Sequence, residues 1–137
     1  MVYERNKKMK FLGNLLWLIF GGAVTAFAYF AASIPLFVSI IGIPFGVQSV
    51  KIGVLQLWPF GVEVKKIEYE QGCLYTVLNI IWFIYAGIPI FFTHLLFGAL
   101  LAITIIGLPF AKQHFKLAGL ALSPFGKVFV YPKSGIL

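Results

Sequence analysis

Two long uncharged segments set the pattern of this chain. No Asp, Glu, Lys or Arg lies between Lys10 and Lys51, or between Glu70 and Lys112. One membrane-spanning helix needs about 20 apolar residues, so each segment is roughly twice as long as a single span requires. We therefore expect each segment to fold back on itself, through two crossings or a re-entrant turn.

Small residues and prolines divide each segment into parts. The first segment predicts an apolar helix over 14–32, a turn at 33–35 and a second apolar stretch that ends at Ile41. In the second segment the corresponding turn falls at 93–98, and the second stretch ends at Ile106. Each segment is therefore expected to form a transmembrane helical hairpin.

A Gly-x-Pro signal follows each hairpin, as Gly42 and Pro44 in one segment and as Gly107 and Pro109 in the other. Glycine favours the residue after a helix end, and proline favours the first turn of a new helix. The signal therefore predicts a structural helix break, followed by a helix over 44–57 or 109–122 at a new angle.

A Pro-Phe-Gly turn ends each of these later helices. Its structural residues are Pro59 and Gly61 in the first segment, and Pro124 and Gly126 in the second. Beyond the turns, 62–64 and 127–131 have the β-branched and aromatic character of short strands. We expect these strands on the cytoplasmic side, paired with each other or across subunits.

The helices after Gly-x-Pro carry a narrow polar stripe, made of Gln48, Lys51, Lys112, Gln113 and Lys116. On a helical wheel, Gln48 and Lys51 lie about 60° apart. One interpretation is an interfacial amphipathic helix whose lysines contact anionic headgroups. The other is a polar path or a site for an anionic ligand, because polar groups inside a membrane are costly without a role.

The chain repeats itself at an offset of 65 positions. The aligned identities include Asn14 with Asn79, Trp17 with Trp82, Gly42 with Gly107, Gln48 with Gln113 and Lys51 with Lys116. These residue types do not match by chance between two apolar segments. An even number of crossings in each copy predicts that the two copies are parallel and share one orientation.

Composition and charge define the class and the orientation. The chain of 137 residues is 61% apolar and 11% charged, with a net charge of +7, whereas a soluble domain has about 25% charged residues. This composition indicates an integral membrane protein. Basic residues cluster at the start, middle and end of the sequence, which predicts cytoplasmic N- and C-termini.

Candidate chemistry is sparse. The chain has no Asp, a single cysteine at Cys73, and two histidines without zinc-like spacing. We expect no catalytic residue, metal site, cofactor or nucleic-acid partner, and no enzyme activity. His94 is expected to be solvated at a loop or outer interface, and His114 to contact headgroups.

Both copies resemble the YccF family, the inner membrane component domain. The matching strings are 39–46, Lys51 and 57–61 in the first copy, and 104–110, Lys116 and 122–126 in the second; Asn14, Trp17, Asn79 and Trp82 fit the Leu-Asn-x-x-Trp opening of the family. The resemblance implies a small bacterial inner-membrane protein built from two copies of this unit. It implies no assigned reaction or ligand.

Together, these features predict an all-α membrane protein of two parallel tandem repeats. Each repeat is a transmembrane helical hairpin broken at Gly-x-Pro, followed by an interfacial amphipathic helix and a short cytoplasmic β-strand. The expected divisions are a basic tail at 1–10, repeats at 11–64 and 76–131, a charged connection at 65–75 and a tail at 132–137.

Two functions are compatible with this architecture. The first is a homo-oligomeric structural or interaction component of the inner membrane, with its protein partners unidentified. The alternative is an oligomeric channel or small-solute conduit, with the polar stripe near its mouth. Positive charge at that mouth would favour anions.

Overall fold

The computed structural model describes residues 2–67 and 72–131. The expected tail at 132–137 and part of the expected connection, 68–71, lie outside the described residues. The first repeat forms α1 (Val2–Trp17), the π-helical turn η1 (Leu18–Gly22), α2 (Ala23–Val38), α3 (Ile43–Leu57) and β1 (Glu63–Lys66). The second forms α4 (Cys73–Trp82), the π-helical turn η2 (Phe83–Gly87), α5 (Ile88–Ala102), α6 (Leu108–Leu122) and β2 (Lys127–Val130).

Each repeat contains one helical hairpin, but its position differs from the prediction. α2 packs against α3 and α5 packs against α6, with the connection at the Gly-x-Pro signal. The predicted turns at 33–35 and 93–98 are wrong, because these residues lie inside α2 and α5. Pro35 is tolerated there because it lies in the last turn of α2, where few further backbone bonds are lost.

The helix after Gly-x-Pro is the second arm of the hairpin, and its interfacial position in the membrane stays a prediction. Phe45, Ser49 and Ile52 follow the buried face of α3, and the Ser49 hydroxyl donates to the backbone oxygen of Tyr29 in α2 at 2.6 Å. The polar stripe of α3 lies away from this face, with Lys51 exposed and Gln48 half-buried.

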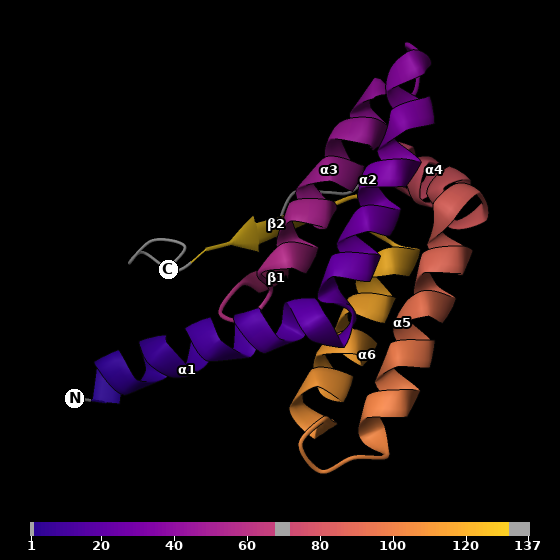
Figure 1. Ribbon diagram of the computed structural model, residues 1–137. Coiled ribbons are helices and arrows are strands. Elements are labelled where there is room, and N and C mark those ends of the chain that lie inside the picture. Colours follow the sequence, from indigo (N-terminus) through magenta and orange to yellow (C-terminus); the bar gives the residue numbers. More distant parts are fainter. Residues whose placement is uncertain (1, 68–71, 132–137) are drawn as a thin grey trace.

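The expected straight helix over 14–32 is interrupted. Gly21 has φ +114°, a left-handed conformation that glycine adopts without a side-chain clash. α1 and α2 consequently meet at a steep angle (Figure 1). By length and composition alone, Glu4–Val38 and Cys73–Ala102 could each cross a membrane, but Glu4–Val38 is divided by this kink.

The two hairpins point in opposite directions in the fold, whereas the predicted shared orientation of the repeats concerns the membrane and stays a prediction. Phe45, at the start of α3, contacts Phe125 beyond α6 with ring centroids 4.9 Å apart. Its counterpart Phe110, at the start of α6, contacts Phe60 beyond α3 at 5.7 Å. The tips of the hairpins therefore point in opposite directions, upward for α2 and α3 and downward for α5 and α6 in Figure 1.

The strand pair explains the opposite directions of the hairpins. β1 and β2 pair antiparallel, and Val64 lies opposite Phe129, its own counterpart at the offset of 65. Antiparallel pairing relates two strands by a two-fold axis, and the same pseudo-two-fold axis relates the hairpins. The sequence argument counted crossings in each copy and had no information on which strands pair.

Candidate functional sites: a buried histidine pair and a basic cavity

Two histidines meet in the protein interior. His94 in α5 and His114 in α6 are both fully buried, and their Nδ1 atoms lie 3.0 Å apart. The Nε2 atom of His114 lies 2.9 Å from the backbone oxygen of Phe20. The pair therefore connects the second hairpin to the helix break of the first.

The carbonyl oxygen of Phe20 determines the direction of these hydrogen bonds. A carbonyl accepts only, so the Nε2–H of His114 donates to it. In a neutral ring the Nδ1 of His114 is then an acceptor, and the Nδ1–H of His94 donates to it. The remaining atom, Nε2 of His94, is buried and has no hydrogen-bond partner among the described residues.

Aromatic rings and the glycine at the kink enclose the pair. Trp17 packs on the His114 ring with centroids 4.2 Å apart, and Phe97 stacks on it at 5.4 Å. A Cβ atom added to Gly21 would lie 2.8 Å from the Phe97 ring and 3.0 Å from His114. The left-handed glycine thus both produces the kink and leaves space for these two rings.

The contact between these histidines is not predicted by the sequence. His94 was expected to be solvated and His114 to contact headgroups, and both predictions are wrong, because antiparallel packing of the hairpins buries them. One signal could have located them. Their counterparts at the offset of 65 are Tyr29 and Ser49, which are polar and buried as well.

A basic cavity of about 450 Å³ lies between α3 and β2. Its lining residues are Gln48, Val50, Lys51, Val54, Lys127, Val128, Phe129 and Tyr131. Gln48 is held in place by donating from Nε2 to the backbone oxygen of Pro124 at 2.8 Å. This bond ties the first hairpin to the turn of the second repeat. Two predicted polar residues, Gln48 and Lys51, therefore meet Lys127 and Tyr131, which the sequence analysis did not single out.

Lys127 is the most constrained cation of the cavity. Partial burial, and then the charge of Lys66 opposite it in the strand pair, lower the pKa of Lys127. Its ammonium donates to the backbone oxygen of Ser123 at 3.2 Å. An ammonium in this environment is incompletely compensated, so an anion beside it would be stabilised.

The other residues of the predicted stripe lie apart from this cavity. Lys112 and Lys116 are exposed on α6, and Gln113 is half-buried. Among the predicted break residues, Gly42 and Gly107 immediately precede α3 and α6, with Pro44 and Pro109 in the first turns. The structure therefore brings together only part of the predicted polar set.

The Pro-Phe-Gly turns are fixed by the repeated asparagines. Asn14 donates to the backbone oxygen of Phe60 at 3.2 Å and accepts from its N–H at 2.8 Å. Asn79 makes the same two bonds with Phe125, at 3.2 and 2.9 Å. Pro59 and Pro124 are buried, and Gly61 and Gly126 supply positive φ angles of +93° and +84°. These turns consequently support the strands that line the cavity.

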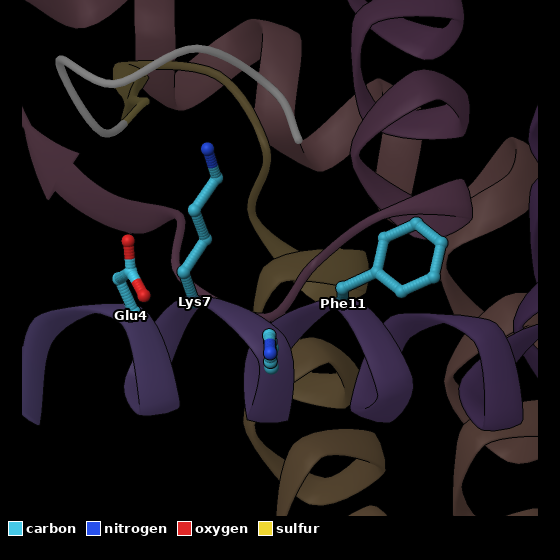
Figure 2. A pocket seen from close by; sticks show the side chains of 4 residues that line it. Glu4, Lys7 and Phe11 are labelled. Atoms are coloured by element: carbon cyan, nitrogen blue, oxygen red, sulfur yellow. The ribbon is translucent and has the colours of Figure 1, made fainter. Parts of the chain in front are cut away.

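A second hollow, of about 420 Å³, lies beside α1. Figure 2 shows Glu4, Lys7 and Phe11 projecting from this helix, and Lys8 completes the lining. These residues are exposed, and the described residues place no buried polar group among them. The hollow indicates a basic helix surface rather than a formed binding site.

Within residues 2–67 and 72–131, no three His, Cys, Asp or Glu side chains gather to hold a metal ion. Cys73 is exposed and unbonded. The positive charge of the basic cavity suits an anionic ligand, whereas the histidine pair is sealed in the interior.

Comparison with known proteins gives one family. The model of the inner membrane component domain, YccF, matches residues 12–62 and 77–127. The chain is 31% identical to the inner membrane protein YccF of Escherichia coli (strain K12) over 129 residues, covering 87% of this chain and 86% of that protein. It has the same identity and coverage with the inner membrane protein YccF of Shigella flexneri. No solved structure matches the chain significantly.

Proposed function

The chain belongs to the YccF family of inner membrane component domains, and on that premise we propose that it is a homo-oligomeric structural component of the bacterial inner membrane. The observation that carries this proposal is the contrast between its outer surface and its interior. Large apolar side chains cover the outside. Inside, buried polar side chains form hydrogen bonds to backbone atoms of neighbouring helices and so connect the helices.

The outer surface of both hairpins is suited to lipid. Phe27 is 72% exposed and its counterpart Phe92 is 60% exposed. The hairpin tips are also apolar, with Ile40 at 85% and Ile105 at 87% exposure. A soluble monomer rarely exposes apolar area on this scale, so a bilayer is the environment that these surfaces favour.

The arms of the two hairpins are shorter than the hydrocarbon core of a bilayer is thick. α2 has 16 residues and α5 has 15, which corresponds to about 24 Å at 1.5 Å per residue. The hydrocarbon core of a bilayer is about 30 Å thick. We propose that neither hairpin crosses the membrane and that the pseudo-two-fold axis lies along the membrane normal, so that the two hairpins run along the membrane in opposite directions within one leaflet.

The distribution of lysines supports the same placement. Lys51 lines a cavity with β2, so the lysine-bearing face of α3 is directed toward the strand pair. Lys112 and Lys116 lie four positions apart on the exposed face of α6, with Lys116 the counterpart of Lys51. Lysines on one face, together with β1 and β2, define a cytoplasmic side in this arrangement. The beginning of α1 and the end of β2 lie on this side (Figure 1).

Small residues exposed on the outer surface of the helices favour self-association of the chain. Ala23 and Ala31 are exposed on α2, and Ala99 is exposed on α5. In lipid, helices associate where small residues permit close approach of their backbones. We propose that copies of the chain pack through these faces, and that non-enzymatic scaffolding is the role of the assembly.

The alternative, an anion conduit, lacks a supporting contact in the described residues. Gln48 bonds to the Pro124 carbonyl, and the Gln56 side-chain oxygen accepts from Thr25. These groups stabilise packing between helices instead of lining an open path. A conduit would therefore have to form between copies of the chain.

Two measurements on the full chain test this function. Light scattering after size exclusion in several mild detergents should give a mass above that of one chain, and a monomer in all of them would contradict the assembly. Liposomes containing the purified protein should show no chloride or potassium flux above protein-free liposomes. Reproducible flux would contradict the structural role and favour the conduit.

A further inference from the structure

We infer that the cavity between α3 and β2 is a binding site for the phosphate group of an anionic phospholipid. This inference rests on the membrane placement proposed above, because that placement brings the cavity to the level of the cytoplasmic headgroups. It assigns a ligand class to a site that the family membership leaves unassigned.

Charge is the first argument. Lys51 and Lys127 line the cavity, and Lys66 lies opposite Lys127 in the strand pair. Among the described residues, no carboxylate lines the cavity. The carboxylate of Glu63 in β1 instead lies 3.3 Å from the ammonium of Lys65. The cavity therefore presents positive charge that lacks an acidic partner among its lining residues, and a phosphate would supply one.

The lining also contains groups that a phosphate ester can use beyond charge. The Tyr131 side chain carries a hydroxyl donor, and the Gln48 amide is held at the cavity by its bond to Pro124. Lys127 is directed by its bond to the Ser123 carbonyl. These bonds preorganise the polar part of the site, which lowers the entropic cost of binding.

The remaining lining selects an amphiphile over a free ion. Val50, Val54, Val128 and Phe129 form an apolar wall beside the lysines. A free phosphate would leave this wall unused, whereas a phospholipid places glycerol and acyl carbons against it. The volume of about 450 Å³ is in the range of small-molecule sites and exceeds the size of a single phosphate.

The pseudo-symmetric position, between α6 and β1, carries different residues from the cavity, which provides an internal control. At the offset of 65, the counterpart of Lys127 is the buried Val62, and the counterpart of Val128 is Glu63. At the pseudo-symmetric position near Lys116, the first repeat therefore supplies an apolar residue and an acid, where β2 supplies a lysine and an apolar residue to the cavity. Lys116 therefore carries the same charge as its counterpart Lys51 but does not line this cavity.

Native mass spectrometry tests the inference. The full chain is mixed with short-chain lipids in detergent and then released from the detergent in the spectrometer. We expect one phosphatidylglycerol per chain to be retained in preference to phosphatidylcholine. The double variant K51A/K127A should lower retention of phosphatidylglycerol at least tenfold, and K112A/K116A, which removes the same charge from α6, should leave it unchanged. The conservative K51R/K127R variant should keep most of the retention.

Several outcomes would overturn the site. Equal loss in K112A/K116A would mean that retention follows total charge, and equal retention of phosphatidylcholine would mean that the cavity is not selective for anionic lipid. Displacement of the lipid by millimolar inorganic phosphate would assign a free-anion site instead. If K51A/K127A does not fold, the single variant K51Q, at an exposed position, provides the same comparison against K116Q. An oligomer that fails to form would refute the proposed assembly and leave lipid retention by a single chain measurable.

Discussion

Val64 lies directly opposite Phe129 in the strand pair, although 65 positions separate them and each is the counterpart of the other in the repeat. The pseudo-two-fold axis therefore passes between these two residues. The histidine pair and the basic cavity depart from this symmetry, because their residues differ from their counterparts in the other repeat.

The first prediction concerns membrane topology. In a chain whose native Cys73 is replaced by serine, cysteines introduced by I40C and I105C lie at the two apolar hairpin tips. Hairpins that run along one leaflet keep both tips within lipid, so a membrane-impermeant maleimide should label neither from the periplasmic side. V130C, on the proposed cytoplasmic side, should react only in inside-out membranes and serves as the control. Labelling of one tip in right-side-out cells and of the other in inside-out membranes would establish spanning hairpins, because the tips point in opposite directions.

The second prediction concerns the kink. G21A places a side chain at φ +114° and within 3.0 Å of Phe97 and His114, so it should destabilise the fold by at least about 2 kcal/mol. G119A is the matched control, because an added Cβ there meets nothing within 4 Å. Denaturation in mixed detergent micelles measures both. Equal denaturation midpoints for G21A and G119A would contradict the requirement for glycine at the kink.

The third prediction separates a packing role from a proton-exchange role at the histidine pair. H94A leaves the Nδ1 of His114 buried without its partner, at an expected cost of about 1–3 kcal/mol. The double variant H94Y/H114S installs the residues of the first repeat, where the Ser49 hydroxyl bonds to the Tyr29 carbonyl. We expect it to recover at least half of the lost stability.

Proton flux provides the complementary readout for this pair. Liposomes with an internal pH dye should show the same slow proton leak for the unmodified chain and for H94Y/H114S. A faster leak that the double variant abolishes would show that the histidines move protons, and would contradict a purely structural interpretation.

The fourth prediction is a pH dependence of lipid retention. Burial and the charge of Lys66 lower the pKa of Lys127. The Lys127 side chain therefore loses its proton and its positive charge at a lower pH than an exposed lysine does. Retention of phosphatidylglycerol should be full near neutral pH and should fall as the pH rises through the lowered pKa of Lys127. K127R keeps its charge at these pH values and should retain lipid over the same range. An identical decline for K127R would exclude Lys127 as the titrating group.

The sequence by itself determined the class, the family and the repeat. Uncharged segments of this length cannot be covered by the polar surface of a small soluble domain, so the apolar pattern alone indicated a membrane protein. The repeated Asn, Trp, Gly and Pro residues revealed two copies, because such residue types have specific backbone and hydrogen-bonding roles. Asn14 illustrates this: its side chain fixes the turn at Phe60, and Asn79 repeats the arrangement.

Only the tertiary structure decided how the copies are related and which residues meet. Helical periodicity reports which face of a helix is apolar and carries no information on its partner, so the polar face of α3 suggested an interfacial helix although its other face packs on α2. The contact between His94 and His114 and the cavity shared by Lys51 and Lys127 depend on antiparallel packing and on strand pairing. Both are long-range relationships, set by hydrogen bonds and side-chain packing between segments distant in the sequence.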